Sequence, residues 1–70
     1  MTLDLSLIVP CYNEARHLRA NVRTVVETLE LSPWSWEIVF VDDASQDETR
    51  ALIREICAAD ARCRYIFHGA

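Results

Sequence analysis

Two short polar segments carry the side chains of this sequence that could do chemistry, and each follows a largely apolar run. Residues 9–14 read VPCYNE after the run at residues 5–8, and residues 41–45 read VDDAS after the run at residues 38–40. Together the segments supply one aromatic ring and three carboxylates, on Tyr12, Glu14, Asp42 and Asp43. An aromatic face combined with hydrogen-bond acceptors is suited to binding a flat polar ligand.

The first segment lies between a predicted strand and a predicted helix. Residues 5–9 are rich in β-forming residues, and Pro10 should close this strand because proline cannot donate a ladder hydrogen bond. From Glu14 onward, apolar residues recur at three- and four-residue steps, which predicts an amphipathic helix. Asn13 is its expected N-cap. The helix should end before Pro33, since the residue preceding a proline avoids helical geometry.

The second segment has the same setting. Residues 36–41 predict a strand that is apolar on both faces, as in a central strand covered by helices on both sides. Ser45, followed three residues later by Glu48, has the pattern of a capping box and predicts a second helix. A third strand is expected at residues 64–67. His68 after it is within reach of the ends of the other strands but is interpreted as a surface histidine.

This order of elements predicts an α/β fold, a βαβαβ parallel half-sheet with helical crossovers. The carboxyl ends of parallel strands lie at one edge of the sheet, where open α/β sheets bind ligands, so the two polar segments should meet in one crevice. A sheet this small leaves strand edges open. We therefore expect residues 1–70 to be the N-terminal part of a larger domain, incomplete by itself and able to self-associate through those edges.

Composition narrows the class of partner. The 70-residue chain has a formal net charge of −4 and scattered arginines, which disfavours a nucleic-acid partner. Its apolar runs are far shorter than the roughly 20 residues of a membrane span, and no basic signal-peptide region opens it. A cytoplasmic location without a membrane segment in this chain is therefore expected. Three cysteines at spacings that match no common zinc pattern predict reduced thiols, and we assign no chemistry to Cys11.

Three kinds of ligand site are compatible with acidic groups at a strand edge. A dinucleotide fingerprint or a P-loop needs glycines after the first strand. Since the only glycine of the sequence is Gly69, both motifs are absent. A phosphoacceptor receiver domain has its paired acids after the first strand, whereas Asp42 and Asp43 follow the second. The third kind holds a nucleobase by stacking on Tyr12 and by a carboxylate that accepts a ring N–H, with Glu14 and Asp42 near the base or ribose.

Both segments resemble the two N-terminal signatures of family 2 glycosyltransferases, which have the Rossmann-like GT-A fold and include polyprenyl-phosphate sugar transferases. The resemblance extends over nearly the whole chain. It implies a nucleotide pocket in which Tyr12 packs on the base and Asp43 contacts it. The nucleotide-binding residues implied by the resemblance are Pro10, Tyr12, Glu14, Asp42 and Asp43. Where the family usually has glycine, this chain has Ala44, which costs roughly 1 kcal/mol if the backbone is left-handed there.

The resemblance also implies an activity for the complete protein. It would transfer a sugar from a nucleotide-diphosphate sugar to an acceptor, a polyprenyl phosphate or a glycan, in cell-wall or glycan biosynthesis. A divalent cation, Mg²⁺ or Mn²⁺, is expected in the complete enzyme, with its ligands and the catalytic base outside this segment, which should be inactive alone. The complete protein is compatible with the cytoplasmic face of a membrane. The alternative is a non-catalytic nucleotide-binding or interaction module.

Overall fold

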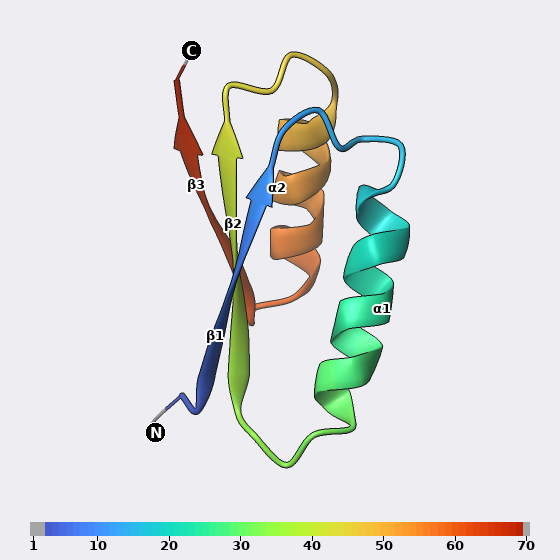
Figure 1. Ribbon diagram of the computed structural model, residues 1–70, viewed down its shortest axis with the longest axis vertical. Coiled ribbons are helices and arrows are strands. Elements are labelled where there is room, and N and C mark those ends of the chain that lie inside the picture. The colour runs from blue at the N-terminus through green and yellow to red at the C-terminus, as the bar shows by residue number, and fades with distance from the viewer. Residues whose placement is uncertain (1–2, 70) are drawn as a thin grey trace.

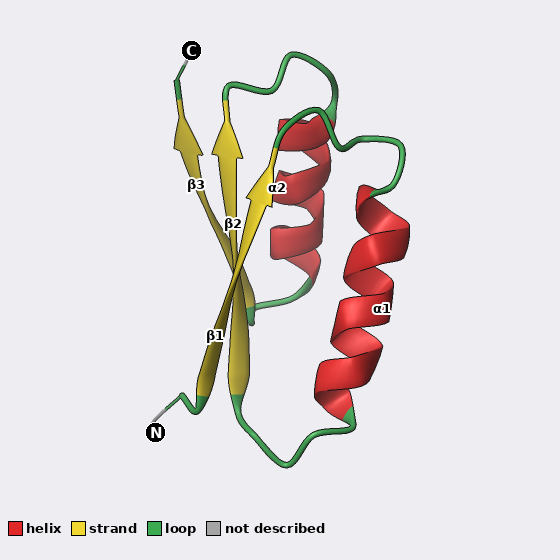
Figure 2. Cartoon of the chain, viewed as in Figure 1, coloured by secondary structure: helices red, strands yellow, loops and turns green. Residues whose placement is uncertain are grey.

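The computed structural model describes residues 3–69 as a three-stranded sheet with two helices (Figure 1). Strands and helices alternate along the chain (Figure 2). The elements are β1 (Leu5–Cys11), α1 (Leu18–Glu30), β2 (Trp36–Asp43), α2 (Thr49–Ala59) and β3 (Cys63–His68). β2 pairs in parallel with β1 on one side and with β3 on the other. The predicted βαβαβ parallel half-sheet is therefore confirmed.

Both helices lie on the same face of the sheet (Figure 1). The expectation that β2 is covered by helices on both sides is therefore wrong. The β2 side chains on the helix face, Trp36, Ile38 and Phe40, are at most 5% exposed. On the opposite face, Ile8 of β1 and Ile66 of β3 remain 56% and 45% exposed. Within residues 3–69 no helix covers this opposite face, although Val39 of β2 on that face is only 3% exposed.

The hydrophobic core fills the space between the sheet and the two helices. An amphipathic helix buries one apolar stripe, and each helix contributes such a stripe to this layer. The buried core residues are Cys11, Leu18, Leu29, Trp36, Ile38, Phe40, Ile53 and Cys63. Within residues 3–69, no helix has both the length and the apolar character needed to cross a membrane.

Strand β1 continues past the proline that was predicted to close it. Pro10 lies inside the strand, in register with Val41, and Cys11 lies in register with Asp42. Among the described residues β1 is an edge strand, where the missing N–H of proline breaks no ladder hydrogen bond on the free side. The longer strand brings the first polar segment level with the acidic end of β2.

Helix α1 begins later than the sequence predicted. Its N-cap residue is His17, which makes no side-chain capping hydrogen bond. Asn13, the predicted N-cap, lies in the left-handed region with φ 50°. One turn precedes the helix, because the N–H groups of His17 and Leu18 both donate to the carbonyl of Glu14. The residues between β1 and α1 therefore form a loop, and this loop makes its hydrogen bonds to residues that follow β2.

The predicted capping box at the start of α2 does not form. Glu48 occupies the N-cap position without a side-chain capping hydrogen bond. The Ser45 hydroxyl donates instead to the carboxylate of Asp42. Asp47 accepts one of the free backbone N–H groups of the first helical turn, because the N–H of Thr49 donates to its Oδ1 at 2.9 Å. Asp47, and not Ser45, therefore accepts a backbone N–H at the start of α2.

Ala44, directly after β2, lies in the left-handed region with φ 58°. Its N–H donates to the carbonyl of His68 at 2.9 Å, which ties the end of β3 to the end of β2. A non-glycine residue loses roughly 1–2 kcal/mol in this conformation because its Cβ crowds the backbone. Ala44 is therefore a point of backbone strain at the edge of the sheet where the strands end.

We expect Ala44→Gly to raise the free energy of unfolding by about 0.5–1 kcal/mol. Relief of the left-handed strain should exceed the entropy that glycine adds to the unfolded chain. Urea denaturation followed by tryptophan fluorescence measures the change. Ala51, exposed on α2, is the matched control, and there the same substitution should lower stability by about 1 kcal/mol. Equal losses at both positions would show that Ala44 is not strained.

Candidate functional site

A hollow lies at the edge of the sheet where the strands have their carboxyl ends. Its volume is about 460 Å³, and its lining comes from the ends of all three strands and from the loop after β1. The lining residues are Pro10, Cys11, Tyr12, Glu14, Val41, Asp43 and His68. The structure thus brings Pro10, Tyr12, Glu14 and Asp43 together, as the sequence predicted. Asp42 does not line this hollow.

The two neighbouring aspartates at the end of β2 have opposite environments. Asp43 is exposed, whereas Asp42 is 0% exposed. Successive side chains of a strand point to opposite faces. Asp42 therefore points into the layer of helices, and Asp43 points to the open face that carries the hollow.

The carboxylate of Asp42 is fully engaged in hydrogen bonds inside the protein. Its Oδ2 accepts from Arg50 Nε at 2.7 Å and from the Ser45 N–H at 3.1 Å, and its Oδ1 accepts from the Ser45 hydroxyl. Burial raises the pKa of Asp42, but the hydrogen bonds from Ser45 and Arg50 together outweigh burial and lower it. Asp42 is thus a buried anion that organises its surroundings.

The guanidinium of Arg50 extends this contact to the third strand. It donates to the carbonyl of His68 as well as to Asp42. Its Cζ lies 4.6 Å from the centroid of the Phe67 ring, within the range of a cation–π contact. One arginine on α2 therefore joins the ends of β2 and β3.

Hydrogen bonds also join the loop after β1 to the loop after β2. Backbone N–H groups of the first loop donate to side-chain oxygens of the second, and one N–H of the second donates back. These cross-loop hydrogen bonds are Asn13 N to Ser45 Oγ at 2.8 Å, Glu14 N to Thr49 Oγ1 at 2.8 Å, Ala15 N to Asp47 Oδ2 at 3.3 Å, and Gln46 N to Asn13 Oδ1 at 2.8 Å. Both walls of the hollow are therefore held in one arrangement.

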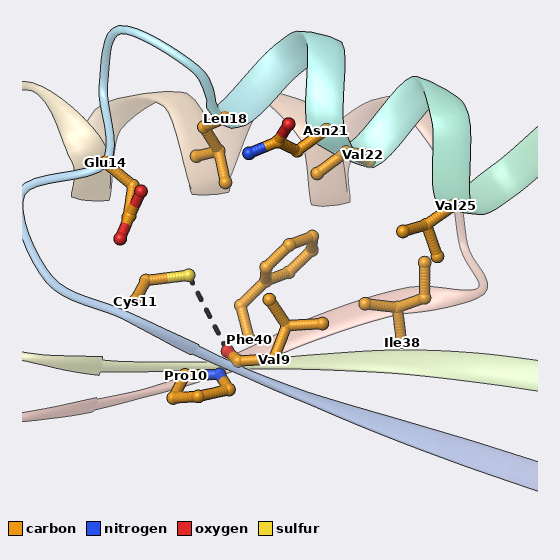
Figure 3. A pocket seen from close by; sticks show the side chains of 10 residues that line it. All are labelled: Val9, Pro10, Cys11, Glu14, Leu18, Asn21, Val22, Val25, Ile38 and Phe40. Carbon is orange, nitrogen blue, oxygen red and sulfur yellow. Dashed lines mark hydrogen bonds between the residues drawn. The ribbon is translucent and has the colours of Figure 1, made fainter.

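A second, more apolar cavity of about 200 Å³ lies between α1 and the sheet (Figure 3). Leu18, Val22 and Val25 of α1 point into it from one side, and Ile38 and Phe40 of β2 point into it from the other. Such a lining favours a dry space over a polar ligand. We therefore place the candidate site in the hollow at the strand ends and not in this cavity.

The thiol of Cys11 lies where the hollow and the inner cavity meet. Its Sγ donates to the carbonyl of Val9 at 3.6 Å (Figure 3). Burial, together with the nearby charges of Asp42 and Glu14, raises the pKa of Cys11 to about 11. A thiol with so high a pKa stays protonated at neutral pH and is a poor nucleophile.

Three lining residues, Cys11, Val41 and His68, were not among the predicted site residues, and His68 is the one with a polar ring. It is exposed, as predicted, but it lies at the rim of the hollow, in register with Asp43. Its position at the end of the third parallel strand is the signal that placed it within reach of the crevice in the sequence analysis, because parallel strands end at one edge. Its imidazole adds a donor and acceptor to an otherwise acidic rim.

No group of three or more His, Cys, Asp or Glu side chains within residues 3–69 could hold a metal ion. The acidic groups of the hollow, on Glu14 and Asp43, do not by themselves fit the divalent cation that the resemblance implies. Their chemistry in this chain is that of hydrogen-bond acceptors.

We expect Asp42→Asn to lower the free energy of unfolding at pH 7 by about 3 kcal/mol, since it breaks a buried ion pair with Arg50. Asp43→Asn is the matched control on the neighbouring, exposed residue, and it should change stability by less than about 0.5 kcal/mol. Urea denaturation of both variants measures the two effects.

The loss caused by Asp42→Asn should depend on pH. The folded pKa of Asp42 is lowered, so its carboxylate stabilises the protein above the unfolded value of about 3.9 and loses this contribution as the pH falls through the folded pKa. The difference between wild type and variant should therefore shrink in acid. A difference that is the same at neutral and strongly acidic pH would contradict the assignment.

Comparison with known proteins supplies the family. The profile described as Glycosyl transferase family 2 matches residues 6–70. A bactoprenol glucosyl transferase of Shigella phage SfV is 38% identical over 58 residues, which are 83% of this chain and 19% of that protein. The glycosyltransferase AglD of Haloferax volcanii is 37% identical over 65 residues, 90% of this chain and 10% of that protein.

A third relative is the dodecaprenyl-phosphate galacturonate synthase of Rhizobium johnstonii, 40% identical over 48 residues, 69% of this chain and 14% of that protein. The chain spans about a fifth or less of the length of these relatives. The match runs through both polar segments and through the strands and helices that bring them together. On this evidence the chain belongs to glycosyl transferase family 2.

Proposed function

We propose that this chain forms the donor-nucleotide pocket of a glycosyltransferase that moves a sugar from a nucleotide-diphosphate sugar to an acceptor. The observation that carries the proposal is the meeting of Tyr12, from the loop after β1, and Asp43, from the end of β2, in one hollow. By itself the chain would bind the donor nucleotide without transferring the sugar.

The groups of the hollow suit a nucleoside. The Tyr12 side chain is 60% exposed, so one face of its ring is open to a base, and stacking needs no particular base. Asp43, exposed at the end of β2, offers a carboxylate that accepts an N–H from the base or a hydroxyl from the ribose. Pro10 gives a rigid apolar wall, and Glu14 a second acceptor, for the ribose.

The names of two relatives support a choice of acceptor. One is a bactoprenol glucosyl transferase, and the other is a dodecaprenyl-phosphate galacturonate synthase. We therefore propose a polyprenyl phosphate as the acceptor, met at the cytoplasmic face of a membrane. The divalent cation expected for the complete enzyme, Mg²⁺ or Mn²⁺, stays part of this proposal, with ligands other than the side chains of this hollow.

We expect Tyr12→Ala to weaken the binding of UDP or GDP about tenfold, because loss of a stacking platform costs roughly 1–3 kcal/mol per base. Tyr12→Phe keeps the ring and should bind within about twofold of wild type. Isothermal titration of the chain with each nucleotide, in the presence of EDTA, measures both effects. The chelator should not matter if the hollow holds the nucleoside and not a metal-bound diphosphate.

Tyr65 is the matched control for this truncation. It is 41% exposed and stacks on Phe67 with ring centroids 4.5 Å apart, on the helix face of β3. Tyr65→Ala should leave nucleotide affinity unchanged in folded protein. Equal affinity in wild type and Tyr12→Ala would overturn the stacking role, and binding of neither nucleotide by the wild type would overturn the proposed pocket.

A further inference from the structure

We propose that Asn13 and Ser45 are positioning residues, which transmit the placement of the buried Asp42–Arg50 pair to the residues that line the hollow. The inference rests on the proposed function, because it concerns the same nucleotide pocket. It assigns a role to two side chains that do not line the hollow. Neither would touch the nucleotide, and both would set its affinity.

Asn13 stands between two of the lining residues, Tyr12 and Glu14. Its backbone is left-handed, with φ 50°, a conformation that asparagine tolerates better than most residues. Its N–H donates to Ser45 Oγ and its Oδ1 accepts from the N–H of Gln46, both at 2.8 Å. The loop after β1 is thus fixed to the loop after β2 at the residue that separates the aromatic ring from the carboxylate.

Ser45 continues this connection into the interior. Its hydroxyl accepts the Asn13 N–H and donates to Asp42 Oδ1, while its own N–H donates to Asp42 Oδ2. Asp42 is fully buried and paired with Arg50, so this end of the chain of hydrogen bonds cannot shift without exposing or unpairing a charge. The contacts therefore run from α2 through Asp42 and Ser45 to Asn13.

A second contact fixes the far side of the same loop. Thr49, fully buried at the start of α2, accepts the N–H of Glu14 at 2.8 Å and donates to Asp47 Oδ1. The hydrogen bond that the Ala15 N–H donates to Asp47 Oδ2, 3.3 Å long, lies beside it. Thr49 anchors the backbone that carries the Glu14 side chain, and Asn13 anchors the backbone that carries Tyr12.

The exposure of the two positioning residues makes them testable. Asn13 is exposed and Ser45 is half-buried, so truncating either should leave the core intact. The residues between β1 and α1 belong to no strand or helix, so the cross-loop hydrogen bonds are the contacts that fix their position. Loss of one cross-loop hydrogen bond should therefore change the geometry of the hollow more than the stability of the fold.

The test is a double-mutant cycle with Ser45→Ala and Asn13→Gly. Glycine keeps the left-handed backbone and its N–H while removing the Oδ1 acceptor. Each single variant removes one cross-loop hydrogen bond and should bind UDP or GDP about fivefold more weakly. Ser45→Ala also removes the hydrogen bond from the hydroxyl to Asp42 Oδ1, so its urea midpoint should fall as well. The double variant should bind no more than about tenfold more weakly, less than the product of the two, because either change releases the same loop.

Conservative variants and a remote control separate positioning from general loss of stability. Ser45→Thr keeps the hydroxyl and Asn13→Asp keeps the Oδ1 acceptor, so both should bind within about twofold of wild type. Val26→Ala removes apolar contacts of α1 with the core and touches neither loop. It should lower the urea midpoint without changing nucleotide affinity at temperatures where the protein is folded.

The outcomes are distinct. Wild-type affinity in Ser45→Ala and Asn13→Gly, with weakened binding in Tyr12→Ala, would overturn the positioning role and leave the nucleotide pocket standing. Weakened binding that follows the urea midpoint across all variants, Val26→Ala included, would also overturn it. If the wild type binds neither UDP nor GDP, the pocket and the positioning role both fall.

Discussion

The buried carboxylate of Asp42 is the contact on which the functional edge of this sheet depends. A buried charge is tolerated only when it is paired and hydrogen-bonded. Asp42 meets this condition through Arg50 of α2 and through both the hydroxyl and the N–H of Ser45. Because Arg50 also binds the carbonyl of His68, one ionic contact fixes where β2 ends, where β3 ends and how α2 begins.

The alternation of side chains along β2 places two adjacent aspartates on opposite faces of the sheet. Asp42, on the helix face, is buried and saturated with partners, whereas Asp43, on the open face, is exposed beside Tyr12 and His68. A shift of one residue in register would exchange these environments. The long parallel pairing of β2 with both neighbours opposes such a shift, so the geometry of the sheet selects which aspartate faces the hollow.

The two faces of the sheet also separate stability from recognition. Apolar contacts with α1 and α2 lie on one face, and the hollow opens at the end of the other. Ile8 and Ile66 leave apolar surface exposed on that open face. Exposed apolar groups of this kind favour association, and self-association of the chain stays a prediction. The inner cavity beneath α1 is mostly apolar and adds no polar group beyond Glu14 and Asn21.

The sequence alone predicts the element order and the parallel sheet. Its two polar segments carry the family resemblance and include four of the residues that line the hollow, Pro10, Tyr12, Glu14 and Asp43. The element order and the sheet follow from periodicity and strand-forming runs, and the meeting of the two polar segments follows from the rule that parallel strands end at one edge. The assignment of individual residues to a nucleotide pocket is what the family resemblance implies. The sequence also located Ala44 as a position where the family prefers glycine, and the left-handed backbone there supplies the reason.

The hydrogen-bond partner of each polar side chain, in contrast, depends on tertiary contacts. The sequence predicts Asn13 and Ser45 as helix caps, because a local pattern considers only hydrogen bonds to residues a few positions away. In the fold they bind each other across 32 residues, and Asp42 turns inward to Arg50. Likewise both helices cover one face, because the order of strands in the sheet, which no local pattern encodes, sets the side on which each crossover packs.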